Sequence, residues 1–256
     1  MFKITIVQTD TRWEDVDANI RNISEMLGKH NRKTDMILLP EMFSTGFTMN
    51  APEFAEDQSG RTIAWMLQVA AEYNSILAGS IIFNEEDQYL NRYIAAFPDG
   101  SLRYYDKKHL FTIGAEGKHY SPGQFRMVYG FRGITCCPLI CYDLRFPVWS
   151  RNRERYDLLT YVANWPASRQ EAWKALLKAR AIENQCYVVG VNRVGNDGLG
   201  LHYAGESIVA GPEGEILFKA DDKEKVETIE LDIDHLRGVR TKFPFLDDAD
   251  HFELLQ

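Results

Sequence analysis

Cys141 stands at the end of an apolar run, residues 134–140, and precedes the segment Tyr-Asp-Leu-Arg-Phe-Pro. A cysteine that ends a strand just before a turn and a helical segment can lift its sulfur out of the sheet. There it lies close to helix-terminal N–H groups that favour the thiolate. The main-chain N–H of Tyr142 could then help to hold an oxyanion. Alternatively, Cys141 is a small buried apolar residue like Cys136 and Cys137, and the local context alone does not exclude this.

Two charged residues that follow predicted strands could also act on such a thiol. Glu41 comes directly after residues 36–40, at the kind of strand end where α/β sheets place ligands, and could serve as a general base. Lys107 lies in residues 105–111, where its ammonium could favour the thiolate and stabilise developing negative charge. The alternatives are a capping or surface glutamate and a solvated basic loop. For Lys108 we adopt the second alternative.

The remaining candidates are less specific. Glu116 lies in a loop of Gly, His and Tyr residues that is typical of an active-site wall, although an exposed loop acid fits equally well. Cys137 and Cys141 could form half of a metal site with His109 or His119, but no C-x-x-C or H-x-x-x-H spacing supports it. A protease-like pair of His109 and Cys141 has no local marker. The sequence contains neither a G-x-S-x-G elbow nor a G-x-x-x-x-G-K-[ST] phosphate loop.

Strand-like and helix-like segments that could position these residues alternate along the chain. Apolar or alternating runs predict strands at residues 2–8, 36–40, 76–83, 93–97, 102–105, 133–141, 158–162, 187–192, 206–210, 216–219 and 226–233. Helices are predicted at residues 16–27, 62–73, 148–155 and 169–184. Helices between apolar strands, followed by a run of hairpins, predict an α/β protein built as a sandwich of sheets flanked by helices.

The chain shows no linker, charge block or repeat that would divide it, so residues 1–256 are predicted to form a single domain. Residues 237–256 are predicted to be irregular and to form an arm that packs on a partner subunit. The first eight residues read as a strand of the mature protein and not as a secretory leader.

Composition excludes several classes of protein. A net charge of -8 argues against nucleic acid or anionic membrane as the main partner, and no stretch is apolar and long enough to span a bilayer. The chain is 45% hydrophobic, which suits a protein with a substantial core. Three of the four cysteines fall within six positions, a poor arrangement for a disulfide framework, so a reducing cytoplasm is the expected setting.

Five segments together resemble the signature motifs of the nitrilase superfamily of carbon–nitrogen hydrolases, in the family's order. Residues 40–47 resemble its glutamate motif, residues 105–111 its lysine motif and residues 140–147 its cysteine motif. Residues 163–166 with Arg169, and then residues 180–184, also match. The resemblance extends from about residue 2 to the 230s, and five motifs in order are far more specific than one.

This resemblance implies an α-β-β-α sandwich and a homodimer formed through helices near the cysteine and the C-terminal arm. It also implies acyl transfer through a thioester on Cys141, with Glu41 as the general base and acid. Lys107 and the N–H of Tyr142 would stabilise the tetrahedral oxyanion. Glu116 matches the family's second glutamate, which would hold the lysine or position the substrate. No metal or organic cofactor is implied.

Within the superfamily, residues 41–47 and 105–111 look most like the omega-amidase branch. Its enzymes hydrolyse the terminal amide of 2-oxo dicarboxylate monoamides such as 2-oxoglutaramate. Arg169 or Arg145 could anchor the anionic end of such a substrate, beside an aromatic wall of Phe43, Phe47 and Trp165. Each arginine could instead form a structural salt bridge, the interpretation that we favour for Arg145. Phe47 and Trp165 could instead belong to the core.

Several alternatives stay open at this stage. The enzyme could be an N-carbamoyl amino acid or polyamine amidohydrolase, another small aliphatic amidase, or a nitrilase, although its short length disfavours the last. It could also be a non-catalytic binding scaffold, or a redox-sensing thiol protein that uses Cys136, Cys137 and Cys141. If the omega-amidase interpretation holds, an aminotransferase that produces the oxo-acid amide is the expected functional partner.

Overall fold

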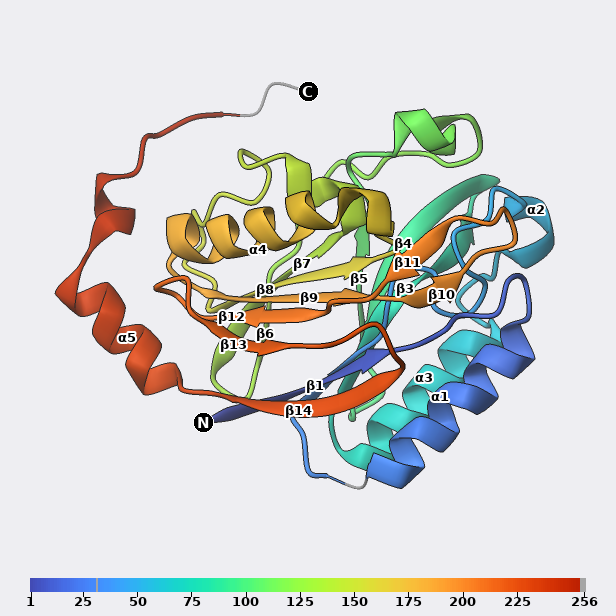
Figure 1. The fold of residues 1–256 in the computed structure, drawn as a ribbon, viewed down its shortest axis with the longest axis horizontal. Coiled ribbons are helices and arrows are strands. Elements are labelled where there is room, and N and C mark those ends of the chain that lie inside the picture. The colour runs from blue at the N-terminus through green and yellow to red at the C-terminus, as the bar shows by residue number, and fades with distance from the viewer. Residues whose placement is uncertain (31, 254–256) are drawn as a thin grey trace.

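Four layers make up the molecule, and the computed structural model describes residues 1–30 and 32–253 (Figure 1). Two mixed sheets of six strands each lie face to face in the middle. Helices α1 (Val16–His30) and α3 (Arg61–Tyr73) cover the outer face of the first sheet, and α4 (Gln170–Asn184) covers that of the second. This is the α-β-β-α sandwich, and the predicted fold class is confirmed.

The two sheets have the same pattern of strand directions. The first has the order β14-β1-β2-β3-β4-β5, in which β1, β2 and β3 are parallel, and the second has the order β13-β12-β9-β8-β7-β6, in which β7, β8 and β9 are parallel. The outer neighbours pair antiparallel. The strands are β1 (Phe2–Gln8), β2 (Met36–Leu38), β3 (Ile76–Glu85), β4 (Gln88–Ala96), β5 (Leu102–Asp106), β6 (Tyr129–Phe131), β7 (Ile134–Ile140), β8 (Leu158–Ala163), β9 (Tyr187–Asn192), β12 (Ile208–Ala210), β13 (Ile216–Lys219) and β14 (Lys225–Leu231).

Smaller elements lie at the ends of the sheets. A separate hairpin, β10 (Val194–Asn196) and β11 (His202–Ala204), follows β9 directly. The other elements are the helices α2 (Ala51–Phe54) and α5 (Ile233–Lys242) and the short 3-10 helices η1 (Thr112–Gly114), η2 (Glu116–Lys118), η3 (Cys141–Arg145), η4 (Ala167–Arg169) and η5 (Phe245–Asp248). Among the described residues, no helix combines the length and the apolar character that crossing a membrane requires.

The alternation of side chains along each strand divides the core into two clusters. Successive residues of a strand point to opposite faces, so Leu38 enters the cluster between the sheets and Ile37 packs outward with Ile23 of α1 and Ile63 of α3. On the second sheet, Gly190 of β9 allows α4 to approach closely, because a Cβ there would lie 2.5 Å from a methyl group of Leu177. The packing of the helices on the sheets, and of the sheets on each other, fixes the positions of the strand ends.

Two predicted segments were wrong. Residues 148–155 were expected to be helical, but the only helical turn of this region among the described residues is η3, which begins at Cys141 itself. The backbone of the predicted segment is held by asparagine side chains instead. Asn152 Oδ1 accepts from Tyr156 N at 2.8 Å, and Asn184 Oδ1 accepts from Asn152 N at 2.9 Å. These side chains replace the helical hydrogen bonds.

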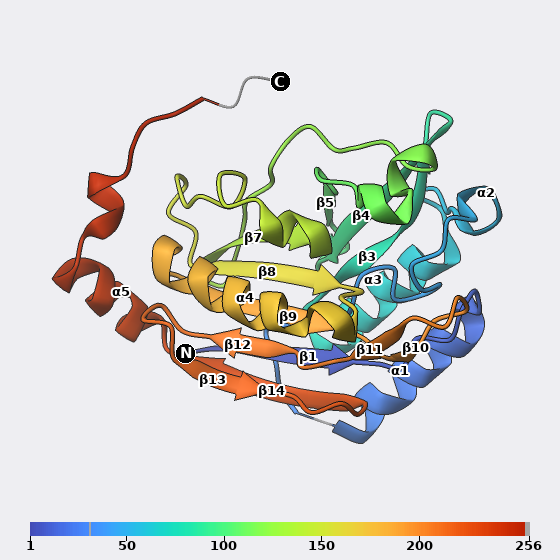
Figure 2. The ribbon, with the colours of Figure 1, turned by 45° about the horizontal axis from the view of Figure 1, so that its top comes forward.

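The C-terminal segment is less irregular than predicted. Residues 237–242 belong to α5, whose start is capped by Asp232 and whose apolar face buries Leu236 and Val239. After α5 the chain runs along the outside of the body (Figure 2), where Asp247 pairs with Arg155 and the ring of Phe252 lies beside Arg153. The last three residues of the predicted arm, 254–256, lie outside the described residues.

Candidate active site

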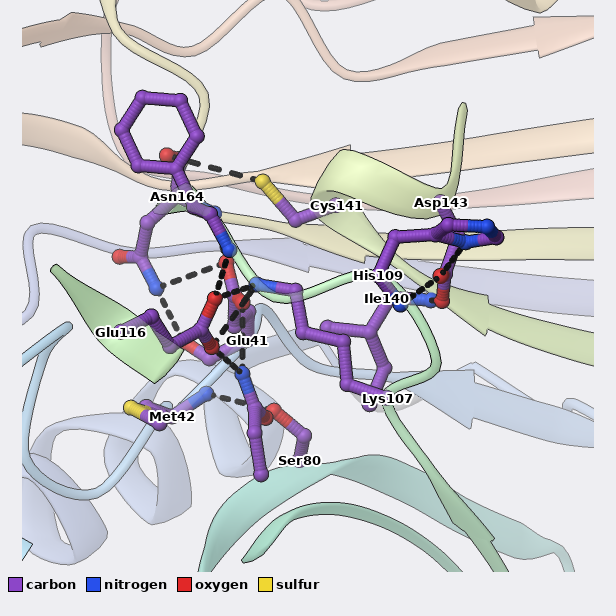
Figure 3. Close-up of polar contacts among 12 residues, drawn as sticks. Glu41, Met42, Ser80, Lys107, His109, Glu116, Ile140, Cys141, Asp143 and Asn164 are labelled. Atoms are coloured by element: carbon purple, nitrogen blue, oxygen red, sulfur yellow. Dashed lines mark hydrogen bonds and ion pairs between the residues drawn. The ribbon is translucent and has the colours of Figure 1, made fainter. Parts of the chain in front are cut away.

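Side chains from both sheets meet at the edge where the parallel strands end. Glu41 follows β2 after two intervening residues, and Cys141 follows β7 directly. Lys107 comes directly after β5, and Asn164 directly after β8. The turn after Glu41 is secured by Ser80 of β3, whose Oγ accepts from the N–H of Met42 at 2.9 Å (Figure 3).

Lys107 lies between two carboxylates in a fully buried cluster (Figure 3). Its Nζ is 2.8 Å from Glu41 Oε1 and 3.0 Å from each carboxylate oxygen of Glu116. All three side chains have 0% exposure. Burial by itself would lower the pKa of Lys107, but the charges of Glu116 and Glu41 outweigh this and raise it, so the ammonium stays protonated. The cluster carries one cation for two acids.

Glu116 reaches this cluster from a loop. Burial raises its pKa, Lys107 opposes the rise, and the neighbouring Glu41 carboxylate adds to it. Its Oε2 also accepts from the main-chain N–H of Phe111, which closes the loop around the carboxylate. Two like charges next to each other thus depend on the single ammonium of Lys107.

Cys141 has a strained backbone and a sulfur directed at the cluster. Its φ is 41°, in the left-handed region that residues other than glycine rarely adopt. The Sγ lies 3.9 Å from the carbonyl oxygen of Asn164, as Figure 3 shows. Loss of hydration raises the pKa of the thiol well above its usual value, and the Glu41 carboxylate raises it further, whereas Lys107 lowers it. These shifts favour the thiol form of Cys141 over the thiolate.

Asp143 holds the turn that contains the cysteine. This buried carboxylate accepts from Ile140 N at 3.0 Å, from Tyr105 Oη at 2.7 Å and from His109 N at 2.9 Å. The ring of His109 is also bound to Asp143, through Nδ1 at 2.8 Å, and stacks on Phe146. The histidine is thus engaged by the aspartate, and its pairing with Cys141 that the sequence left open is not observed.

A cavity of about 170 Å³ opens over Cys141. Of the five residues predicted to bind substrate, all but Phe43 line this cavity. Of the four predicted catalytic residues, all but Glu116 line it. The lining residues are Glu41, Phe47, Met49, Lys107, Phe111, Gly114, Cys141, Tyr142, Arg145, Asn164, Trp165, Pro166, Arg169, Asp197, Leu199, Leu201 and Tyr203.

Phe43 is the expected substrate-binding residue that the structure does not bring to this cavity. It is fully buried, packs against Trp65 of α3 and fills the space beside Gly79. Phe47, four residues later, lies instead with its ring 5.1 Å from Lys107 Nζ. The turn that follows Glu41 sends one aromatic ring into the outer core and the other to the site.

Aromatic rings support both arginines of the cavity. The guanidinium of Arg145 lies 4.9 Å from the ring of Trp165, and that of Arg169 lies 5.0 Å from the ring of Phe111. Neither arginine forms an ion pair with a carboxylate in the part of the chain that the structure describes. The structural salt bridge considered for each is therefore not observed.

The other cysteines are poor nucleophiles. Cys136, Cys137 and Cys186 are buried, and burial raises the pKa of the Cys136 thiol to about 12. Residues 1–30 and 32–253 contain no group of three or more His, Cys, Asp or Glu side chains that could hold a metal ion. The groups assembled beside Cys141, two carboxylates and an ammonium, are of the kind that thiol-dependent acyl transfer requires.

Comparison with known proteins agrees with this geometry. The family model for carbon–nitrogen hydrolases matches residues 3–241. The chain belongs to the carbon–nitrogen hydrolase family. The predicted resemblance is thus confirmed, and the protein is a hydrolase of carbon–nitrogen bonds other than peptide bonds.

Relatives of this carbon–nitrogen hydrolase extend over almost its whole length. It is 46% identical to the omega-amidase YafV of Escherichia coli K12, over 98% of each chain, and 32% identical to the 2-oxoglutaramate amidase of Bacillus subtilis 168, over 96% of each. Its structure superposes with a TM-score of 0.97 on a CN-hydrolase superfamily protein of Xanthomonas campestris that carries an arsenic adduct in its active site. The two chains are 42% identical, over 99% of this chain and 98% of the other.

Sequence reasoning missed three features of this hydrolase's site. Asn91 of β4 touches both buried glutamates, and Asn164 binds Glu41 Oε2 through its N–H at 2.8 Å. The hairpin β10–β11 contributes one wall of the cavity, including Leu199 and Tyr203. Asn91 stands beside Arg92 in a strand that also contains Gln88, so its residue type did not single it out, whereas Asn164 lies in a matched motif. The hairpin had no comparable signal.

Proposed function

We propose that this hydrolase removes the terminal amide of a small 2-oxo dicarboxylate monoamide such as 2-oxoglutaramate, and produces the acid and ammonia through a thioester on Cys141. The observation that carries the proposal is the buried cluster of Glu41, Lys107 and Glu116 beside the thiol, at the floor of a small cavity with two arginines. The names of the relatives from E. coli and B. subtilis support the substrate class.

The first half of the reaction forms the acyl-enzyme. Because the resting thiol is protonated, its proton must move to Glu41 as the sulfur attacks the amide carbonyl carbon. The carbonyl oxygen becomes an oxyanion, and Lys107 and the N–H of Tyr142 stabilise it. Tyr142 stands in the first turn of η3, where a helix leaves its N–H groups without internal partners. Glu41 then gives its proton to the departing ammonia, and a thioester remains.

The second half of the reaction reverses these proton movements. Glu41, again ionised, takes a proton from a water molecule that attacks the thioester carbonyl. The same donors hold the second oxyanion, and its collapse breaks the carbon–sulfur bond. The proton on Glu41 returns to the sulfur, and the free acid leaves. Glu116 holds the ammonium of Lys107 in place through both steps, because both of its oxygens lie 3.0 Å from Nζ.

The arginines explain why the substrate would be an anion. Arg145 and Arg169 face the cavity with their guanidinium groups on aromatic rings and without a carboxylate partner among the described residues. A guanidinium binds a carboxylate through two parallel hydrogen bonds. We assign the 2-oxo acid end of the substrate to Arg169, and Phe47, Tyr142 and Trp165 then form the walls.

Arg169→Gln is expected to raise KM for 2-oxoglutaramate roughly 30-fold with kcat changed by less than about threefold, since an ion pair with a non-reacting group contributes mainly to binding. For butanamide, which has no charge, KM and kcat of the variant should equal those of the wild type. Arg103→Gln on the exposed face of β5 is the matched control and should behave as wild type. Steady-state ammonia release measures both constants, and an unchanged KM in Arg169→Gln would move the anchor to Arg145.

We further propose a cytoplasmic homodimer of single-domain subunits. Apolar side chains lie exposed close to η3, on α4 and on the C-terminal segment, namely Val148, Ile182 and Phe245. The course of the C-terminal segment along the outside of the body in both views suits a contact with a second subunit. An aminotransferase that converts an amino-acid amide to its 2-oxo acid amide would be the functional partner of such an enzyme.

The experiment that tests the substrate is ammonia release by the wild-type enzyme from 2-oxoglutaramate, compared with succinamate, an N-carbamoyl amino acid, N-carbamoylputrescine and an aliphatic nitrile. The highest kcat/KM is expected for 2-oxoglutaramate, with succinamate next. Preference for a carbamoyl compound would move the assignment to an amidohydrolase of that class. If folded enzyme released ammonia from none of them, the protein would be better described as a binding scaffold.

A further inference from the structure

Asn91 contacts all three charged members of the buried cluster. Its Nδ2 donates to Glu41 Oε1 at 2.8 Å and to Glu116 Oε1 at 3.1 Å. Its main-chain carbonyl accepts from the N–H of Lys107 at 3.0 Å, where β4 runs beside the end of β5. We propose that Asn91 is a positioning residue that sets the carboxyl groups of Glu41 and Glu116 on either side of Lys107. The inference rests on the proposed function, because it assigns Asn91 a part in that reaction.

The orientation of the Asn91 amide is fixed by its neighbours. Two carboxylate oxygens lie within hydrogen-bond distance of the same atom, and carboxylates can only accept, so that atom must be the NH2 group. Both of its hydrogens are used. The Oδ1 atom on the other side is buried and accepts no hydrogen bond from a described residue.

The charges of the cluster explain why an amide suits this position. Glu41 and Glu116 share one cation, so the cluster has an excess negative charge in a place with 0% exposure. A lysine or arginine here would neutralise that excess and draw a carboxylate away from Lys107, and an aspartate would add a third negative charge. A neutral group with two donors stabilises both carboxylates and leaves their charge available. Among the described residues, Asn91 is the neutral side chain that bonds to both.

The hydrogen bonds to Glu41 show what would move without Asn91. Oε1 is held by Lys107 and Asn91, and Oε2 by the main-chain N–H and, at 3.4 Å, the side chain of Asn164. Without the Asn91 donor, Lys107 remains as the hydrogen-bond donor to Oε1 among the described residues. The carboxylate can then rotate toward the ammonium. The base that must reach Cys141 would then lose its fixed geometry. A misplacement of about 1 Å near reacting groups can cost about 100-fold in rate.

Two variants of Asn91 test the inference. Asn91→Leu keeps the approximate shape and removes the donors, and it is expected to lower kcat about 100-fold with KM changed by less than about threefold. The acidic limb of its kcat/KM profile should move to higher pH, because carboxylates without their donor take up a proton more readily. Asn84→Leu on β3 is the matched control: that side chain is partly exposed, makes no contact with the cluster and should leave kcat unchanged.

Asn91→Asp separates hydrogen bonding from shape. The added carboxyl, when protonated, can donate one hydrogen bond, and it becomes a third negative charge when it ionises. Activity above that of Asn91→Leu is therefore expected at low pH and should be lost as pH rises. Both variants should keep a cooperative thermal transition. If Asn91→Leu does not fold, the comparison of Asn91→Asp with wild type carries the test. The inference would be overturned if the variants kept the kcat of the wild type. It would also be overturned if both variants lost the same fraction of kcat and kept the pH profile of the wild type.

A measurement without substrate keeps this inference separate from the proposed function. Infrared difference spectra in the Cys141→Ala background report the protonation of the buried carboxylates during a pH titration, and Glu116→Gln assigns the band. Asn91→Leu is expected to shift proton uptake to higher pH. If Asn91→Leu shifts the pH of proton uptake but the wild type does not turn over 2-oxoglutaramate, the proposed substrate alone would be contradicted. Turnover by wild type without any shift would contradict the role of Asn91 alone.

Discussion

Cys141→Ala is expected to release no ammonia above background from 2-oxoglutaramate, a loss of more than about 10⁴-fold, because no thioester can form without the sulfur. The folded state should change little. The sulfur lines the cavity and lies 3.9 Å from the carbonyl oxygen of Asn164, so its removal takes away no strong hydrogen bond to that residue. A melting temperature close to that of wild type is therefore expected, and the loss of activity would report chemistry and not unfolding.

Cys136→Ala is the matched control. Cys136 stands on the same strand, β7, and is buried in the core between the sheets. Its replacement should lower the melting temperature and leave kcat near that of wild type. Intact-protein mass spectrometry of acid-quenched reactions should find an added acyl group on wild type and on Cys136→Ala, and none on Cys141→Ala. Turnover by Cys141→Ala would show that the nucleophile lies elsewhere.

Glu41→Gln and Lys107→Met are expected to have the same effect on turnover and opposite effects on the thiol. Both should lose roughly 10³-fold in kcat, the first because it removes the base and the second because it removes the oxyanion donor. Glu41 raises the pKa of Cys141, so its neutralisation should lower that pKa and speed alkylation by iodoacetamide at pH 8. Lys107 lowers the same pKa, so its removal should slow alkylation.

The pH profile of alkylation checks the sign of this effect. Thiolate is the reactive form, so the profile of Glu41→Gln should lie at lower pH than that of wild type, and that of Lys107→Met at higher pH. Cys141→Ala corrects for alkylation of the other cysteines. Slower alkylation in Glu41→Gln would contradict the assignment of Glu41 as an anion that holds the thiol protonated at rest.

Lys107→Met should also destabilise the fold in a pH-dependent way. It leaves Glu41 and Glu116 buried without their cation, and the loss of one partner from a buried ion pair costs about 3–5 kcal/mol. Burial already raises the pKa of Glu116 in the wild type, and the variant should raise it further. A raised carboxyl pKa means that the folded state binds more protons, so the free energy of unfolding should fall as pH rises through that pKa. Urea denaturation at several pH values measures this.

The residues of the candidate site come from two different sheets, and this bears on how the protein folds. Glu41 and Lys107 come from the first sheet, whereas Cys141 and Asn164 come from the second. One oxygen of the Glu41 carboxylate is held by the N–H of Asn164, 123 positions away, and this hydrogen bond can form only when the two sheets pack together. We therefore expect the geometry of the candidate site and the core between the sheets to form together.

The sequence by itself determined the ends of the strands and hence the three groups that follow them. The apolar runs before Glu41 and Cys141 end where a strand must leave the core, and the structure has β2 and β7 there. The strand predicted before Lys107, from its place after a turn, is β5. Periodicity also located α1, α3 and α4, since each has an apolar face that must be buried. The layered fold follows from this order of elements.

Only the tertiary structure decided which side chains share the site. Phe43 and Phe47 are alike in sequence, yet one fills the space beside Gly79 and the other lies by Lys107, because the turn between them points them to different layers. Asn91 lies beside Lys107 because β4 pairs with β5. The hairpin β10–β11 forms a wall of the cavity because it lies next to Cys141 in the folded protein. Such contacts join residues far apart in the chain, and no local pattern of residues specifies them.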